Sequence, residues 1–216
     1  MSILTTLAEQ LKAYNENAVK KMPEEVLNKM VQATTDLAQS DIAKGLEIGD
    51  HAPDFTLSDP TGKELNLYEQ LQKGPVILTF YRGEWCPYCN LELRAYQQAL
   101  PEINALGAQL IAISPQTPDH SLSMKEKNEL AYPVLSDVGS HVIKEYNLLF
   151  ELPTYLVEVY KGFGINLEEF NDSDWSLPVP ATFIIDQNGK IRLASVNPDY
   201  TKRMEPSEVI NELKSL

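Results

Sequence analysis

Hydrophobic residues along the chain follow two different periods, and the segments that carry them alternate. Short runs rich in β-branched residues, such as residues 76–81 and 109–114, predict buried strands. Between them, apolar residues recur every three to four positions, which predicts amphipathic helices. Strands that alternate with helices indicate an α/β sheet whose crossovers are right-handed.

Residues 1–44 lack this alternation and are predicted to form two helices, the second beginning at Pro23. The alternation of strand and helix patterns begins after Gly45, so we predict an N-terminal helical extension over residues 1–44 and a main domain over residues 45–216. The apolar stripes of the two helices pack either on the main domain or on a partner subunit, which leaves a homodimer open. These stripes consist of Ile3, Leu4, Leu7 and Leu11, and of Val26, Leu27, Met30, Val31 and Leu37.

The main domain is predicted to begin with a hairpin and to end with a second one, whose turn contains Asn188 and Gly189. Residues 152–175 are interpreted as an insertion that covers one side of the sheet. The expected strands cover residues 49–57, 64–67, 76–81, 109–114, 132–136, 177–186 and 191–196. The expected helices cover residues 67–73, 90–100, 119–130, 139–146, 154–160 and 206–213, and Pro101 is expected to kink or end the second of them.

Composition narrows the class of protein. A chain of 216 residues with 43% hydrophobic and 23% charged residues suits one ordinary domain with an appendage. The net charge of −13 argues against a nucleic-acid partner, because the phosphate backbone would be repelled. No apolar run is long enough to cross a bilayer and no signal segment opens the chain, so we expect no membrane partner and a cytoplasmic location.

The candidate chemistry lies in one motif, Cys86-Pro-Tyr-Cys89, which holds both cysteines of the chain. The motif follows the predicted strand 76–81 and begins a helix, whose N-terminal dipole favours a thiolate. A second cysteine three residues later lies on the same helix face, so the pair can close and reopen by thiol–disulfide exchange. We predict that Cys86 attacks and that Cys89 resolves the mixed disulfide. No cofactor is expected.

Three other interpretations of the cysteine pair remain. A structural disulfide would close so small a loop that it adds little stability. A zinc site needs about four ligands, and the three histidines of the chain do not accompany a second cysteine pair, so no metal is expected. Two inert buried thiols are the third interpretation, although cysteines at helix N-termini are seldom inert.

The order of these elements resembles the thioredoxin fold, a central mixed sheet flanked by helices, here with an N-terminal hairpin and the helical extension. In that family a cis proline precedes the final hairpin and sits against the cysteine pair, and Pro180 matches this position. The resemblance implies that Val179 offers its backbone to a bound peptide. Trp85 and Pro180 would then shape the substrate groove, although Trp85 can equally serve packing.

The opening of the main domain, Gly49-Asp-His-Ala-Pro-Asp-Phe-Thr-Leu57, resembles the peroxiredoxins of the alkyl hydroperoxide reductase and thiol-specific antioxidant family. Laid on the signature of that family, Cys89 falls on the peroxidatic cysteine and Cys86 on the threonine. Arg82 replaces the signature proline, and Pro180 stands where the family has its catalytic arginine. The site is therefore more similar to a thioredoxin or glutaredoxin site on a peroxiredoxin frame.

The leading hypothesis is a thiol–disulfide oxidoreductase that uses Cys86 and Cys89. The alternative is a thiol peroxidase in which Cys89 or Cys86 reduces hydrogen peroxide or alkyl hydroperoxides. Either enzyme takes a disulfide or peroxide substrate and needs an external thiol reductant of the thioredoxin or glutathione type, and Arg82 is expected at the substrate. A third hypothesis is a redox-responsive binding module that has no turnover.

Overall fold

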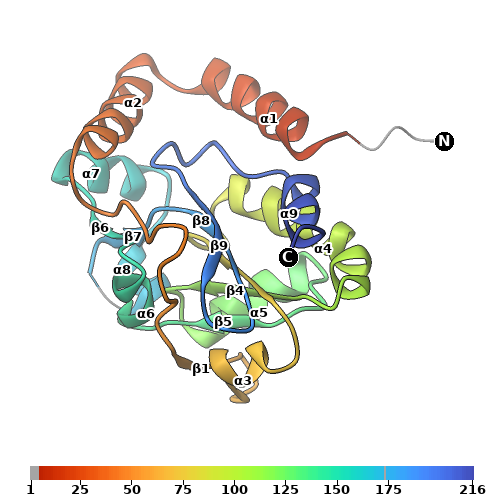
Figure 1. Ribbon diagram of the computed structural model, residues 1–216. Coiled ribbons are helices and arrows are strands. Elements are labelled where there is room, and N and C mark those ends of the chain that lie inside the picture. The colour runs from red at the N-terminus through yellow and green to blue at the C-terminus, as the bar shows by residue number, and fades with distance from the viewer. Residues whose placement is uncertain (1–4, 173) are drawn as a thin grey trace.

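The structure is a computed structural model that describes residues 5–172 and 174–216 (Figure 1). The predicted stripe residues Ile3 and Leu4 lie outside the described residues. A seven-stranded mixed sheet with the order β2-β1-β5-β4-β3-β8-β9 forms the centre. Its strands are β1 (Thr56–Ser58), β2 (Glu64–Asn66), β3 (Val76–Phe80), β4 (Gln109–Ser114), β5 (Val134–Ser136), β8 (Ala181–Ile185) and β9 (Ile191–Val196). The predicted thioredoxin fold is confirmed.

Helices cover both faces of this sheet. Their bounds are α1 (Leu7–Lys21), α2 (Glu24–Gln39), α3 (Leu67–Leu71), α4 (Pro87–Ala105), α5 (Pro118–Lys127), α6 (His141–Glu145), α7 (Thr154–Gly162), α8 (Leu167–Asn171) and α9 (Pro206–Leu213). Buried residues of α1, α4 and α9 share one hydrophobic cluster with one face of the sheet, and those of α3 and α6 share a second cluster with the other face. The sheet is therefore buried on both sides.

Strand β3 shows how the pattern of residues produces this layering. It runs parallel to β4 and antiparallel to β8, and all five of its residues are buried. Because side chains alternate along a strand, Ile77 joins the cluster on the α4 side, whereas Val76 and Leu78 join the opposite cluster. A continuous apolar run is thus what a central strand with helices on both faces requires.

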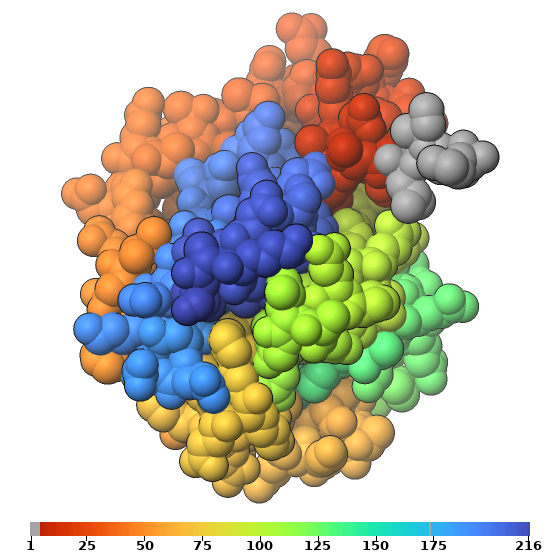
Figure 2. Space-filling model, turned by 45° about the vertical axis from the view of Figure 1, so that its right-hand side comes forward, coloured from red at the N-terminus to blue at the C-terminus, as the bar shows by residue number. Residues whose placement is uncertain are grey.

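The two predicted N-terminal helices are present. Thr6 and Glu9 form a capping box at the start of α1, and Leu7 and Leu11 are buried in the same cluster as α4. Helix α2 has no fully buried residue and packs its partly buried side chains, such as Met30, against the cluster around α7. Figure 2 shows these helices, in red and orange, beside the blue C-terminal segment. The domain boundary between residues 44 and 45 stays a prediction.

Three predictions about the chain path need correction. The expected strand 177–186 is broken at Val179 and Pro180, because its first part forms β7 (Ser176–Pro178), which pairs with β6 (Leu149–Glu151) in a separate sheet. Pro101 does not end α4, which continues to Ala105 with Ile103 buried in the core, and the kink expected there stays a prediction. The expected cis bond at Pro180 is wrong, since no described peptide bond is cis.

Candidate active site

The turn between β3 and α4 places the two cysteines. Cys86 is the N-cap residue of α4 and Pro87 is its first residue, where a missing N–H costs no helical hydrogen bond. The side chain of Asn90, which is buried, donates to the carbonyl oxygens of Glu84 and Cys86, each at 2.8 Å. Asn128 in turn donates to the Asn90 side chain at 2.9 Å. This chain of hydrogen bonds fixes the turn that carries the motif.

The two thiols are free, fully buried and inequivalent. Burial alone raises the pKa of Cys86, but a hydrogen bond from the Cys89 thiol, the charges of Arg82 and Arg203 and the Cys89 backbone N–H outweigh it and lower the pKa to about 6. Burial and the neighbouring Cys86 sulfur raise the pKa of Cys89. Cys86 is therefore the thiol that ionises first, as the sequence predicts for a helix N-terminus.

A buried ion pair lies on the other side of Cys89. Arg203 bonds Glu92 through its Nε at 2.5 Å, and both side chains are almost fully buried. The same guanidinium donates to the carbonyl oxygens of Tyr200 and Lys202 and approaches the Cys89 sulfur at 3.4 Å. Burial raises the pKa of Glu92 to about 7, although Arg203 opposes this shift. The Glu92 carboxylate lies directly on the Arg203 guanidinium, so the two side chains form an ion pair.

A cavity of about 300 Å³ lies over Cys86. Its wall comes from α1, α2, the turn and first residues of α4, the α7 region and the segment before α9. Tyr88 of the motif donates a hydrogen bond to Asn15 at 2.8 Å and packs edge-on against Tyr14, so α1 is held over the site. Cys86 lines this cavity but is only 1% exposed, which restricts access to small molecules in this conformation.

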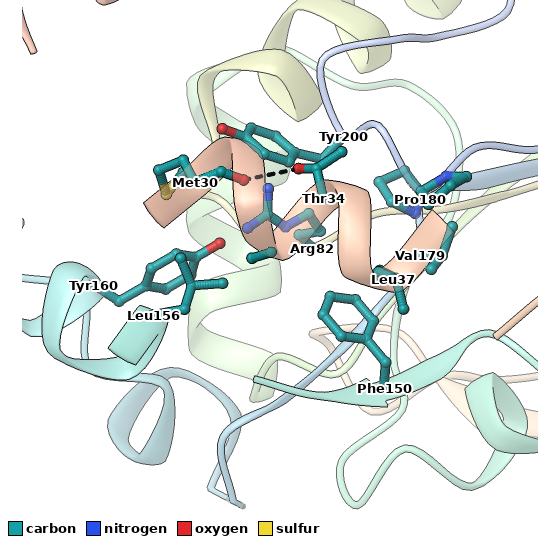
Figure 3. Close-up of a pocket in the computed structure, with 12 residues that line it drawn as sticks. Met30, Thr34, Leu37, Arg82, Phe150, Leu156, Tyr160, Val179, Pro180 and Tyr200 are labelled. Atoms are coloured by element: carbon teal, nitrogen blue, oxygen red, sulfur yellow. Dashed lines mark hydrogen bonds between the residues drawn. The ribbon is translucent and has the colours of Figure 1, made fainter. Parts of the chain in front are cut away.

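The other predicted site residues lie near this cavity. Trp85 and Arg82 line it together with Cys86. Val179 and Pro180 instead line an adjacent cavity of about 30 Å³, which Arg82 also borders (Figure 3). Val179 is buried and its N–H already donates to Leu148 at 2.8 Å, so its backbone is not free to pair with a peptide here. The assignment of these residues to substrate binding stays a prediction.

Sequence reasoning overlooked Glu92, Arg203 and Tyr200. A signal existed for Glu92, since it lies three residues after Cys89 and a helix places such residues on one face. Arg203 is 114 residues from Cys89 and reaches it only through the tertiary fold. Tyr200 packs edge-on against Tyr88 and its ring faces the guanidinium of Arg82, and no local pattern marks it.

The described residues form neither a metal-ion cluster nor a helix that could span a membrane. No group of three or more histidine, cysteine, aspartate or glutamate side chains in residues 5–172 and 174–216 is arranged to hold a metal ion. None of the helices formed by these residues has the length and apolar character that crossing a bilayer demands.

Solved structures share the fold of this chain. Peroxidoxin BcpB from Mycobacterium tuberculosis superposes with a TM-score of 0.63 at 22% identity, covering 79% of this chain and 98% of that one. A mutant PrxQ from Xylella fastidiosa gives a TM-score of 0.63 at 19% identity, covering 79% and 96%. At such identities the likeness concerns the fold alone.

Sequence comparison identifies the family. Over 164 residues the chain is 29% identical to the chloroplastic Peroxiredoxin Q of Suaeda salsa, a match covering 76% of this chain and 64% of that protein. Over 158 residues it is 27% identical to Thiol-disulfide oxidoreductase ResA of Bacillus cereus, which covers 73% of each. Residues 48–194 match the AhpC/TSA family as a whole. The chain, with its paired cysteines at the start of α4, therefore belongs to the AhpC/TSA family.

Proposed function

We propose that this chain is a thiol oxidoreductase in which Cys86 attacks the substrate and Cys89 resolves the intermediate. The observation that carries the proposal is that the two cysteine sulfurs differ in pKa and in position. Cys86 has a lowered pKa and lines the cavity, whereas Cys89 has a raised pKa and lies one helical turn further into the core. Of the two thiols, Cys86 is thus the one that is ionised at neutral pH and that borders the cavity.

With a disulfide substrate, the reaction has two exchange steps. The Cys86 thiolate attacks one substrate sulfur, the substrate S–S bond breaks, and one substrate thiolate leaves. Cys89 then loses its proton and attacks the Cys86 sulfur, which closes the Cys86–Cys89 disulfide and releases the second substrate thiol. The substrate gains two electrons and the cysteine pair loses two. An external thiol reductant returns them.

A hydroperoxide is the second candidate substrate, favoured by membership of the AhpC/TSA family and by the relatives named Peroxiredoxin Q. The Cys86 thiolate would attack the terminal peroxide oxygen, break the O–O bond and release an alcohol or water as a sulfenic acid forms. Cys89 would then displace water from this sulfur. Cys86 and Pro180 stand where the family site has its threonine and its arginine. The positive charges near the Cys86 sulfur would come instead from Arg82 and Arg203.

Burial of Cys86 discriminates between classes of disulfide. A folded protein partner cannot bring its disulfide to a sulfur that is 1% exposed, unless α1 and α2 move away. A small disulfide or a hydroperoxide can enter the cavity of about 300 Å³ as it stands. The geometry therefore favours a small oxidant, and turnover of insulin is expected to be slow.

The test compares steady-state turnover of hydrogen peroxide, of 2-hydroxyethyl disulfide and of insulin in the intact chain and in two serine variants. Cys86→Ser is expected to abolish turnover of all three. Cys89→Ser is expected to keep a single first turnover that ends in a trapped mixed disulfide or sulfenic acid on Cys86. If Cys86→Ser spares the first turnover with peroxide and Cys89→Ser abolishes it, the roles are reversed and Cys89 is peroxidatic.

Absence of turnover with every oxidant would leave the redox-responsive binding module, which predicts instead a partner whose affinity changes with dithiothreitol. The cytoplasmic location and the homodimer stay predictions. Fractionation of cells and the molecular mass in solution test them.

A further inference from the structure

Arg82 is a buried cation without a carboxylate. It is 4% exposed, it forms no ion pair among the described residues, and its Nε has no hydrogen-bond partner there. Arg203, whose side chain is 2% exposed, has Glu92 as its counter-ion. Taking a guanidinium out of water without a counter-ion is strongly unfavourable. Apart from the Cys86 thiolate, whose pKa its charge lowers, Arg82 therefore has no anionic group beside it among the described residues.

Three aromatic rings surround this guanidinium in place of an acid. Its central carbon lies 4.4 Å from the ring centre of Tyr200, 5.1 Å from that of Trp85 and 5.6 Å from that of Tyr160. Figure 3 shows the guanidinium beside the Tyr200 ring, with Tyr160 and Met30 on the same side of the cavity. Cation–π contacts offset part of the lost hydration, but they use the faces of the guanidinium, and its Nε–H stays without an acceptor among the described residues.

The space around Arg82 is apolar apart from this charge. Arg82 borders both the cavity of about 300 Å³ over Cys86 and the adjacent cavity of about 30 Å³, and the Cys86 thiolate is the one other charged side chain among the described residues that line them. Methionine and aromatic side chains, among them Met22, Met30 and Phe163, form much of the larger wall. One buried cation in an apolar chamber is complementary to a molecule with one anionic end and an apolar body.

We propose that the cavity over Cys86 binds small monocarboxylates with an apolar body, with the carboxylate on Arg82 and the body against the aromatic wall. A carboxylate accepts two parallel N–H bonds from a guanidinium, so it matches the donors that Arg82 leaves unused. The preferred oxidant is then a small disulfide that carries a carboxylate. This statement about the oxidant rests on the proposed oxidoreductase activity. The binding itself needs no redox chemistry.

The binding test uses octanoate and its neutral isostere octanamide as probes, titrated by calorimetry into the full chain that carries Cys86→Ser. Octanoate is expected to bind roughly ten- to a hundredfold more tightly than octanamide. This ratio corresponds to the contribution that hydrogen bonds between charged groups make to affinity. Arg82→Met is expected to remove this preference. Arg192→Met serves as the matched control, since Arg192 is an exposed arginine paired with Asp186 elsewhere on the chain, and it is expected to keep the preference.

Octanoate is also expected to protect Cys86 of the unmodified chain from iodoacetamide, a readout that does not depend on the folding of Arg82→Met. Equal binding of octanoate and octanamide, no saturable octanoate binding, or a preference that survives Arg82→Met would each overturn the proposal.

A kinetic comparison separates this proposal from the proposed function. The intact chain is expected to show a higher kcat/KM for 3,3′-dithiodipropionate than for 2-hydroxyethyl disulfide, and the ratio is expected to fall to about one in Arg82→Met. The ratio cancels the effect of Arg82 on the reactivity of Cys86, since both substrates meet the same thiolate. Octanoate binding with no turnover of either disulfide would refute the oxidoreductase function alone. Turnover with a ratio near one in the intact chain would refute the carboxylate site alone.

Discussion

Replacing Cys89 by alanine should raise the pKa of Cys86, because it removes the thiol that hydrogen-bonds the Cys86 thiolate. Burial raises the pKa of Cys86, and the Cys89 thiol is the strongest of the influences that oppose it, ahead of Arg82 and Arg203. A hydrogen bond to a charged group contributes about 1.5–3 kcal/mol. Since one pKa unit corresponds to about 1.4 kcal/mol, the loss amounts to roughly one to two units.

The pKa of Cys86, which lies at about 6 in the intact chain, is thus expected at roughly 7–8 in Cys89→Ala. At neutral pH the thiolate fraction would fall from about nine-tenths to between a tenth and a half. The assay is the rate of iodoacetamide alkylation against pH, in which the variant has a single thiol and the acid limb of the intact chain reports Cys86. Cys89→Ser is the matched control, because its hydroxyl keeps a donor, so a smaller rise is expected.

An alkylation midpoint of Cys89→Ala at the same pH as that of the intact chain would refute a role of the Cys89 thiol in lowering the pKa of Cys86. In that case the two arginines and the helix N-terminus would suffice to stabilise the thiolate, and Cys89 would have no part in activating Cys86. An equal rise in Cys89→Ala and Cys89→Ser would instead contradict the hydrogen bond as the cause.

Two further predictions concern the elements around the cysteines. Glu92→Gln leaves Arg203 as an uncompensated buried charge and is expected to lower the free energy of unfolding by about 3–5 kcal/mol in urea titrations, whereas an unchanged midpoint would mean that the ion pair adds no stability. Glu205→Ala removes the carboxylate that accepts from the first backbone N–H groups of α1, at 3.3 Å from Leu7. It is expected to loosen α1 and to speed alkylation of Cys86, and a rate equal to that of the intact chain would show that α1 does not limit access.

Much of the architecture was predictable, because local patterns specify it. The apolar run of β3 identified a central strand, and the Asn188–Gly189 turn identified the last hairpin, where Gly189 takes the positive φ of 76° that such turns need. The helical period identified α1 and α2. Each of these signals lies within about twenty residues of the element it specifies, so the sequence contains it directly.

The errors in the chain path came from long-range competition. Residues 177–186 have the composition of one strand. The first of them pair instead with β6, in which Phe150 lies opposite Leu177 although it is 27 residues earlier in the chain. Pro101 is a local helix breaker, yet α4 continues past it because the burial of Ile103 compensates for the lost hydrogen bond. Packing energy decided both cases, and no window of local sequence contains it.

By itself, the sequence determined the fold class and the identity of the reactive pair, since strand, Cys-Pro-Tyr-Cys and helix follow one another along the chain. Only the tertiary structure decided what surrounds the two sulfurs. Arg203 reaches Cys89 from 114 residues away, and Tyr160 and Tyr200 close on Arg82 from separate segments. The physical reason is that a thiolate responds to charge and burial within a few ångströms, whatever the separation along the chain, and only folding brings those groups within that range.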